Sequence, residues 1–308
     1  MFIIRSMILN NKIVFGTEGK ILKIALIGSN GQIGTDILKY FTEKNEDVIG
    51  LTQDDIDVCY PEKCESVLFQ IKPDIIINTA AFHVVDQCED EAASAFAVNA
   101  GGVKNLCEVC KKLDIALVHF STDFVFGSDE NRTIPYREDD CPGPVSMYGI
   151  SKLAGELVIK YMLKKYFLLR VCGLYGYAGS LGKGSNFVEL MLKLAKQDSV
   201  IKVVNDQITT PTSTKDVTRK LYELIKTEKY GIYHMTNAGQ CSWYEFALEV
   251  FRLSGLSPKV IPISSTEFGA KAKRPFYSVL DNSNLRSIGL KDMRSWKEAL
   301  KDYIKGRP

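Results

Sequence analysis

Apolar residues occur in two kinds of spacing along most of the chain, and the two kinds alternate. Short, nearly unbroken apolar runs are typical of parallel strands that are buried on both faces. Segments with apolar residues three or four positions apart predict helices that bury one face. The predicted strands comprise residues 21–27, 47–51, 73–78, 115–121 and 167–171. The helices predicted around them comprise residues 35–45, a segment after Pro61, residues 91–113 and a segment within 144–166.

This alternation of strands and helices predicts an α/β protein with a doubly wound parallel sheet. From about residue 174 the pattern changes to shorter and less regular elements. The later helices are predicted at 186–195, 216–225, 242–253 and 296–304, and two short strands at 200–204 and 231–235. A smaller second lobe, packed against the carboxyl edge of the sheet, is therefore expected.

Composition narrows the class of protein without naming a function. The 308 residues are 45% apolar and 25% charged, which is near the globular average. A net charge of +2 gives no basic surplus for nucleic acid or an anionic membrane, and no apolar run is long enough for a transmembrane helix. We therefore expect neither nucleic acid nor membrane as a partner. The eight scattered cysteines favour free thiols and a cytoplasmic location, and their spacing predicts no metal site.

A glycine-rich turn separates the first predicted strand from the first helix. Glycine allows a tight turn and a close approach of the backbone, and the helix that follows presents free N–H groups to an anion. The turn therefore predicts binding of a dinucleotide pyrophosphate, with a purely structural turn as the alternative. The contacts predicted here are Gly28, Asn30, Gly31, Gln32, Ile33 and Gly34.

The residues at the end of the second strand do not discriminate between NADPH and NADH. Thr52 and Gln53 follow Leu51, so the strand tip offers neither an acid for a ribose 2′-hydroxyl nor an arginine for a 2′-phosphate. NADPH and NADH both remain candidates. Asp57 and Val58, slightly further on, are predicted to contact the adenine.

Three side chains form a candidate reaction centre. Thr122 follows the strand 115–121, at the sheet edge where ligands bind in such folds. Tyr148 and Lys152 are four residues apart and share one helix face. A nearby ammonium lowers the pKa of a phenol, so Tyr148 could exchange a proton with a carbonyl oxygen that Thr122 orients.

These motifs together resemble a known enzyme family. The glycine spacing and the Tyr148–Lys152 pair resemble extended short-chain dehydrogenases, which have Rossmann-type sheets. Over about residues 22–305 the chain resembles the dTDP-4-dehydrorhamnose reductase family in particular. The segments that resemble it are 78–81, 85–89, 121–126, 186–187, 206–212 and 273–281. The resemblance implies reduction of the C4 ketone of a nucleotide-activated 6-deoxy sugar by NAD(P)H, with dTDP-4-dehydrorhamnose giving dTDP-rhamnose. It also implies that Thr122, Tyr148 and Lys152 are catalytic.

The resemblance implies further contacts and a division into domains. Cofactor contacts would include Ala80, Ala81 and Asn99, as well as Tyr148 and Lys152. Substrate contacts would be His83, Val85, Phe124, Phe126, Gly173, Asn186 and Arg274, with an inter-lobe salt bridge as the alternative for Arg274. We expect an N-terminal extension over residues 1–20, which is a short strand pair or a remnant of cloning. The dinucleotide-binding domain is expected at 21–173, with 205–236 returning to it, and the substrate lobe at 174–204 and 237–308.

Two departures from the family pattern bear on the sugar. Phe124 stands where the family usually has tyrosine, and Gly173 stands where typical members have a tryptophan against the sugar. Loss of that aromatic wall would enlarge or reshape the sugar pocket, so a sugar other than 4-dehydrorhamnose stays an alternative. Trp243 is predicted to lie in the core, His119 and His234 to serve packing, and Asp86 and Glu89 to form salt bridges.

Other functions share parts of this pattern. A nucleotide-sugar 4-epimerase or 4,6-dehydratase has the same turn and Tyr–Lys pair, although a dehydratase usually has two acids after the threonine, where Asp123 is the only one. Some relatives are NADP-binding regulatory subunits, such as that of methionine adenosyltransferase. The oligomeric state is open, and a homodimer is one alternative.

Overall fold

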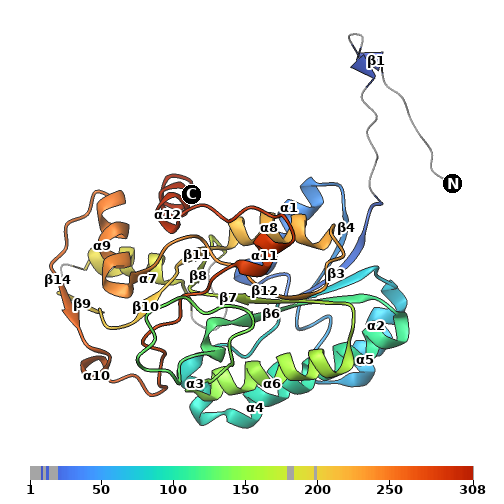
Figure 1. Ribbon diagram of the computed structural model, residues 1–308, viewed down its shortest axis with the longest axis horizontal. Helices are drawn as coiled ribbons and strands as arrows, with labels where there is room; N and C mark the ends of the chain where they lie inside the picture. Colours follow the sequence, from blue (N-terminus) through green and yellow to red (C-terminus); the bar gives the residue numbers. More distant parts are fainter. Residues whose placement is uncertain (1–7, 10–11, 14–19, 179–183, 198–199, 308) are drawn as a thin grey trace.

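A six-stranded parallel sheet forms the centre of the molecule (Figure 1). The computed structural model describes residues 8–9, 12–13, 20–178, 184–197 and 200–307. In spatial order the strands are β12 (Gly231–His234), β7 (Tyr166–Val171), β6 (Ala116–Thr122), β5 (Ile75–Asn78), β3 (Lys23–Ile27) and β4 (Asp47–Leu51). Every pairing in this sheet is parallel, so the predicted doubly wound α/β fold is confirmed.

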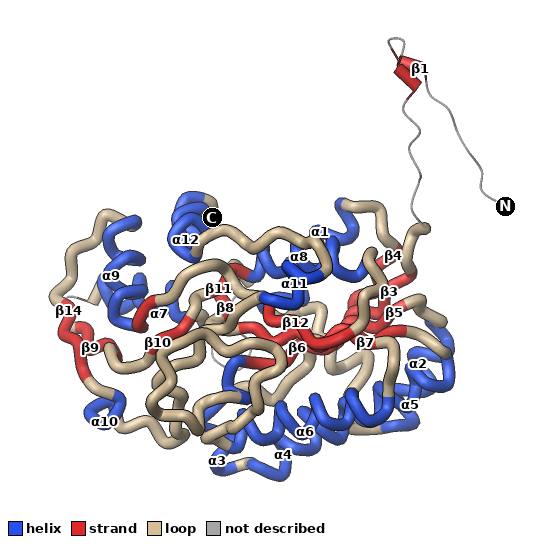
Figure 2. The backbone as a smooth tube through the Cα atoms, viewed as in Figure 1, coloured by secondary structure: helices blue, strands red, loops and turns tan. Residues whose placement is uncertain are grey.

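Helices cover both faces of the sheet, which explains the unbroken apolar runs in the strands (Figure 2). Ile24 and Leu26 of β3 pack on one face with α1 (Gln32–Glu43), α8 (Thr214–Ile225) and α11 (Ser283–Ser287). Ala25 and Ile27 of β3 pack on the other face with α2 (Pro61–Ile71), α5 (Val103–Leu113) and α6 (Met147–Met162). Successive residues of β3 thus enter two separate cores.

The chain reverses its direction across the sheet beside β3. β3 pairs with β4 on one side and with β5 on the other. The connections that leave β3 and β5 therefore diverge at their carboxyl ends and open a crevice there, where ligands bind in doubly wound sheets.

The helix predicted over 91–113 is interrupted. The chain forms α3 (Val85–Asp90), α4 (Ala92–Phe96), a π-helical turn (Ala97–Gly102) and then α5. A Cβ at Gly102 would lie 2.6 Å from a methyl group of Val58, so glycine permits this close packing. Apolar spacing alone did not predict the break, because the π turn retains the helical direction.

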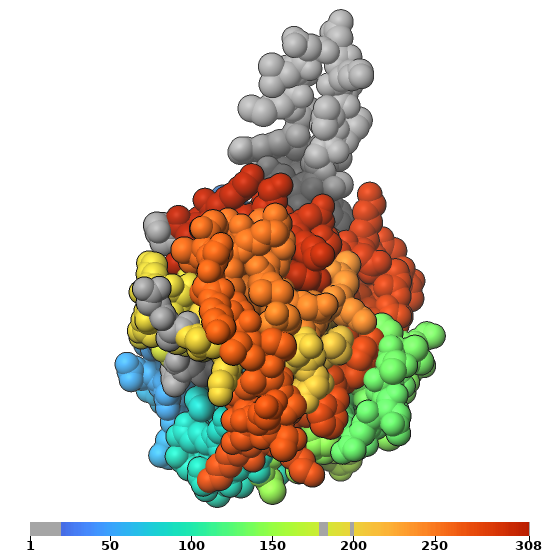
Figure 3. All heavy atoms as spheres, turned by 90° about the vertical axis from the view of Figure 1, so that its left-hand side faces the viewer, coloured from blue at the N-terminus to red at the C-terminus, as the bar shows by residue number. Residues whose placement is uncertain are grey.

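A third apolar cluster, separate from the two sheet cores, holds together the elements at one end of the molecule. Figure 3 shows this end, with residues of about 240–270 in the middle of the face. Its helices are α7 (Phe187–Ala195), α9 (Trp243–Leu253) and α12 (Trp296–Lys305). Ser242 and Glu245 form a reciprocal cap at the start of α9. The shorter elements are β8 (Leu174–Tyr175), β9 (Ile201–Val204), β10 (Ile208–Thr209), β11 (Thr212–Ser213), β13 (Cys241–Ser242), β14 (Val260–Ile263) and α10 (Ser265–Phe268).

The N-terminal segment contains a short strand pair, which was one of the two alternatives predicted for residues 1–20. β1 (Ile8–Leu9) and β2 (Lys12–Ile13) form an antiparallel pair, and the other residues before Lys20 lie outside the described residues. The boundaries of the predicted domains stay a prediction. Within the described residues, no helix is long and apolar enough to cross a membrane.

A buried ion pair joins α6 to the sheet. Arg170 of β7 and Glu156 of α6 are 2.7 Å apart and almost fully buried. The Ser121 hydroxyl donates a further hydrogen bond to Glu156. This pair fixes the helix that contains Tyr148 and Lys152 against the strand that ends at Thr122.

Replacement of Glu156 with glutamine should destabilise the protein strongly. The Glu156→Gln change leaves the Arg170 charge buried without a counter-ion, and we expect a loss of about 3 kcal/mol in the free energy of unfolding. Urea denaturation measures this loss. Glu108→Gln is the control, because Glu108 pairs with Lys104 in solvent, and it should cost less than about 0.5 kcal/mol. Equal losses in the two variants would contradict the structural role of the buried pair.

Candidate active site

The glycine turn brings the carboxyl end of β3 against the start of α1. Gly28 has a φ of +79°, a conformation that favours glycine, and its N–H donates to the carbonyl of Leu51 at 2.8 Å. A Cβ at Gly34 would lie only 2.1 Å from the Gly28 carbonyl oxygen. The glycines therefore let the turn and the helix pack more closely than any other residue would allow.

The residues of this turn fit a dinucleotide. Gly31 caps α1 and has no side chain to occupy the first amides, and no acidic residue lies in the first helical turn. Gln32 donates to the carbonyl of Leu174, but its buried Oε1 atom has no hydrogen-bond partner within the described protein. A helix N-terminus without a side-chain cap and an orphaned acceptor are both features that a bound dinucleotide would satisfy.

Thr122 and Tyr148 meet at the carboxyl end of β6. The Thr122 hydroxyl donates to Asp123 at 3.0 Å, and the Tyr148 phenol lies next to the same hydroxyl. Burial raises the pKa of Tyr148, and the hydrogen bond to Thr122 partly offsets this rise. The phenol therefore stays protonated at neutral pH and is ready to donate.

Lys152 lies one helical turn from Tyr148 and is buried. Its side-chain nitrogen donates to the carbonyl of Phe120 at 2.6 Å and is 3.1 Å from the His119 ring. Burial lowers the pKa of Lys152 to about 8, although the carboxylate of Glu156 acts in the opposite direction. Burial dominates the Tyr148 pKa and raises it, and the expected effect of Lys152 on this phenol stays a prediction.

The family of the chain follows from comparison with known proteins. A family model described as the RmlD substrate binding domain matches residues 22–307. The chain belongs to this family. The sequence is 37% identical over 285 residues to SpsK, a spore coat polysaccharide biosynthesis protein of Bacillus subtilis, over 92% of this chain and 98% of SpsK. It is 36% identical over 284 residues to a dTDP-4-dehydrorhamnose reductase of Mycolicibacterium smegmatis, over 92% of this chain and 85% of that protein.

The fold agrees with the same family. The structure of dTDP-4-dehydrorhamnose reductase from Bacillus anthracis in complex with NADP matches with a TM-score of 0.88 and 37% identity, over 93% of this chain and 99% of that one. The family resemblance and the Rossmann-type fold predicted from the motifs are thus confirmed.

The cofactor contacts predicted beyond the glycine turn differ in how far their side chains are exposed. Ala80 and Ala81 follow β5 beside the crevice and are partly exposed. Asn99 is fully buried, and its amide exchanges hydrogen bonds with the backbone of Phe82 and donates to Ser151. Its side chain therefore positions the loop after β5 and has no exposed surface with which to contact a cofactor.

The two predicted adenine contacts also differ in exposure. Asp57 is partly exposed and accepts a hydrogen bond from the N–H of Cys59. The Val58 side chain is buried under Gly102 in a sheet core, so only its backbone is available to a ligand.

Two predicted substrate contacts are corrected by the structure. Phe126 is fully buried, stacks on Tyr136 and lies beneath the Arg170 guanidinium, so its ring presents no surface to a ligand. Asn186 is buried at the start of α7, where it accepts from Glu189 N–H and donates to the carbonyl of Gly176 and to Tyr303. All of its polar atoms are used in capping.

Arg274 forms a salt bridge, which was the alternative to its predicted role as a substrate contact. Its guanidinium is 2.9 Å from Asp86 of α3, so it forms the predicted salt bridge between the C-terminal segment and the sheet. Glu89 instead accepts from the N–H of Met147 at 2.9 Å and fixes the start of α6. Arg274 is thus committed to a protein partner.

The remaining predicted substrate contacts surround Tyr148 and the loop after β5. Phe124 packs edge-on against Tyr148, with ring centroids 5.7 Å apart. The His83 ring is 3.2 Å from the carbonyl oxygen of Ala81, and Val85 begins α3; both are partly exposed. All three side chains are partly exposed at this edge of the sheet.

Trp243, which the sequence assigned to the core, reaches the position of Gly173. Gly173 has a φ of +52°, and a Cβ there would lie 3.5 Å from the tip of the Trp243 indole. Trp243 also packs on Phe187, with ring centroids 4.7 Å apart. No sequence signal places α9 next to Gly173, because the contact depends on how distant elements pack.

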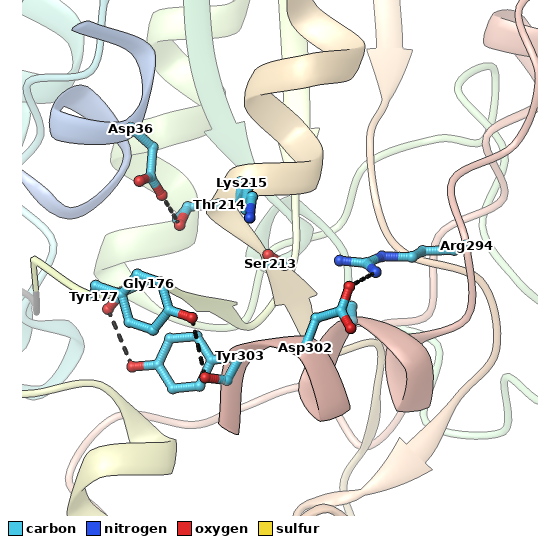
Figure 4. Close-up of a pocket in the computed structure, with 10 residues that line it drawn as sticks. Asp36, Gly176, Tyr177, Ser213, Thr214, Lys215, Arg294, Asp302 and Tyr303 are labelled. Atoms are coloured by element: carbon cyan, nitrogen blue, oxygen red, sulfur yellow. Dashed lines mark hydrogen bonds and ion pairs between the residues drawn. The ribbon is translucent and has the colours of Figure 1, made fainter. Parts of the chain in front are cut away.

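A separate pocket lies on the side of α1 and α8 (Figure 4). Thr214 donates to Asp36 at its rim, and Arg294 pairs with Asp302. None of the predicted site residues is among those that line it. Its polar groups largely satisfy one another, so we do not place the chemistry there.

A methyl group at Gly34 should abolish tight dinucleotide binding. The Gly34→Ala change forces the turn away from α1, and we expect NADPH affinity to fall at least about 10-fold, measured by isothermal titration calorimetry. Gly101→Ala is the control, because its Cβ would lie 3.8 Å from the nearest atom. Wild-type affinity in the Gly34→Ala protein would show that this close approach does not shape the site.

The buried Lys152 should give stability a defined pH dependence. The unfolded chain holds the lysine proton up to its usual pKa of 10.5, whereas the folded protein releases it near 8. The free energy of unfolding should therefore rise between pH 8 and 10.5 by up to about 3 kcal/mol relative to a Lys152→Met variant. Urea denaturation of both proteins across this range measures the difference. Parallel pH profiles would contradict the lowered pKa.

Proposed function

We propose that the protein is an NADPH-dependent reductase that acts on the C4 ketone of a dTDP-activated 6-deoxy sugar and converts dTDP-4-dehydrorhamnose to dTDP-rhamnose. The observation that carries this proposal is the position of the Tyr148 phenol beside the Thr122 hydroxyl at the carboxyl end of β6. The glycine turn of β3 opens at the same edge of the sheet. The names of the M. smegmatis and B. anthracis relatives, and NADP in the latter, support the substrate and the cofactor.

The chain would hold the cofactor with its glycine turn and with the residues after β5. NADPH, when bound, supplies the hydride for the ketone. The first amides of α1 would hold the pyrophosphate, and the orphaned Gln32 Oε1 would accept from a cofactor donor. NADH stays an alternative, since the tip of β4 has no arginine for a 2′-phosphate.

Tyr148 and Thr122 would complete the reaction at the sugar oxygen. As the ketone is reduced, negative charge develops on its oxygen, and Tyr148 donates its proton to that atom. Thr122, which lies beside the phenol, would hold the sugar oxygen in position for this proton transfer. A raised pKa suits this task, since it keeps the phenol in the donor form.

The sugar would lie between the loop after β5 and α9. We propose His83, Val85 and Phe124 as contacts on one side and Trp243, beside Gly173, on the other. Phe126, Asn186 and Arg274 are left out, for the reasons given above. We further propose a cytoplasmic location, because all eight cysteines are free thiols. A homodimer stays a prediction.

Loss of one phenolic oxygen should remove most turnover. The Tyr148→Phe protein should fold and bind NADPH normally, but we expect kcat for dTDP-4-dehydrorhamnose to fall at least about 100-fold, because no acid protonates the product oxygen. NADPH absorbance measures the rate. Tyr161→Phe is the control on the same helix, since Tyr161 is 92% exposed, and it should retain full activity. A Tyr148→Phe enzyme with wild-type kcat would refute the role of the phenol.

The same assay separates the alternatives. Net NADPH oxidation with a 4-keto sugar favours the reductase, and firmly bound NAD without net oxidation favours an epimerase. Absence of oxidation across a panel of dTDP-, CDP-, GDP- and UDP-4-keto sugars, with capture of a partner enzyme, favours a regulatory subunit.

A further inference from the structure

One segment of the chain crosses from the C-terminal elements to the sheet beside the candidate site. Residues 269–275, which we call the strap, follow α10 and run to α3 (Figure 1). α3 begins at Val85, a proposed sugar contact, and packs against α6. The strap therefore bridges the crevice in which the sugar would lie, from the C-terminal elements to the loop after β5.

Charged groups hold the strap on α3. One carboxylate oxygen of Asp86 accepts from the N–H of Ala272, and the other pairs with the Arg274 guanidinium, both at 2.9 Å. Lys271 pairs with Asp90. Because the two acids are four residues apart, they share one face of the helix, and this face meets the strap.

These contacts part more easily than apolar packing would. Both members of the Lys271–Asp90 pair are more than half exposed, and water and salt weaken such pairs. Asp86 is itself 45% exposed. Among residues 269–274 only Ala272 is buried, and an alanine methyl adds little hydrophobic stabilisation. The strap is thus held mainly by charge.

Both ends of the strap are fixed independently of α3. At one end, Asp206 accepts from the N–H and the hydroxyl of Ser265 and so holds the start of α10. At the other end, Pro275 packs against Gly127, where a Cβ would lie 3.0 Å from the proline ring. Gly269 ends α10 with a φ of +65°, and a Cβ there would lie 4.0 Å from the nearest atom. The strap can therefore pivot between Gly269 and Pro275 while its anchors stay in place.

The groups beside α3 explain why the strap would need to move. Burial raises the pKa of Tyr148, and Cys88 of α3 lies close enough to add to this rise. α3 also fixes the start of α6, because Glu89 accepts from the N–H of Met147. We therefore expect a bulky nucleotide-sugar to displace an element beside α3 before it reaches the phenol.

We propose that the strap is a lid over the sugar crevice, latched to α3 by Asp86 and Asp90, which parts from α3 to admit the nucleotide-sugar and closes over it. The inference rests on the proposed function for the identity of the ligand, whereas the latch belongs to the ligand-free protein. Lys271 and Arg274 act in it as latch groups and not as catalytic residues. Closure would keep bulk water from the reaction centre during hydride transfer.

The first test reverses the charges of the latch in protein without ligand. In the Lys271→Asp and Asp90→Lys proteins like charges face each other, so the strap should open more often. We expect the strap amides to exchange with deuterium at least about fivefold faster than in the wild type, measured by mass spectrometry. The Lys271→Asp/Asp90→Lys protein restores the pair and should return to within about twofold of the wild-type rate. Lys273→Asp is the control, because Lys273 is an exposed strap residue outside these ion pairs.

Three results would overturn the latch. They are unchanged exchange in both single variants, fast exchange that persists in the charge-swapped protein, and an equal increase in the Lys273→Asp control. Wild-type protein gives a reading that needs no variant to fold. Between about 0.05 and 0.5 M NaCl the strap amides should exchange at least about threefold faster, and those of α1 should change by less than about twofold. Absence of this salt effect would also overturn the latch.

The second test adds a ligand to the wild-type protein. dTDP-rhamnose, the product of the proposed reaction, should slow exchange of the strap amides at least about fivefold, because the lid closes over it. Protection of the loop after β5 without protection of the strap would overturn the lid and leave the reductase standing. Absence of protection anywhere would refute the proposed substrate, and with it the ligand of the lid, but not the latch measured without ligand.

Discussion

The close packing of α6 against the carboxyl end of β6 is the constraint on which the site depends. A Cβ at Gly149 would lie 2.2 Å from the carbonyl oxygen of Phe124, and one at Gly155 would lie 2.2 Å from that of Asn99. Glycine at both positions lets the helix approach closely enough for Tyr148 to reach Thr122 and for Lys152 to reach Phe120. Ser146 caps this helix and Glu156 anchors it, so both catalytic side chains are fixed by contacts along its whole length.

Burial then determines the chemistry of the groups that meet there. The pKa of Tyr148 is raised and that of Lys152 is lowered, so each group is displaced towards its uncharged form. At a pKa of about 8 Lys152 still holds its proton at neutral pH, and Tyr148 is uncharged. A proton donor next to a hydride acceptor needs this protonated phenol. The packing that stabilises the fold and the protonation that favours reduction therefore have one cause.

Much of this could be predicted from the sequence, because motifs identify residues whose neighbours lie within a few positions. The strand β4 was predicted at its observed bounds, and Thr122 and Tyr148 were predicted to meet. The failures concern the directions of side chains. Asn186 was predicted to contact the substrate, but its side-chain oxygen caps the start of α7. Phe126 follows the catalytic strand, yet the turn after β6 directs its ring into the core. The contact of Trp243 with Gly173 and that of His119 with Lys152 depend on packing between distant elements, which residue spacing does not encode.

The most direct test of the central claim is a crystal structure of the Tyr148→Phe protein with NADPH and dTDP-4-dehydrorhamnose, in which the ketone persists. The account predicts the C4 oxygen of the sugar within about 3.2 Å of Thr122 Oγ1, next to the ring edge from which the Tyr148→Phe change removes the phenol oxygen. A C4 oxygen directed away from Thr122, or a sugar bound outside the crevice between β3 and β5, would contradict it.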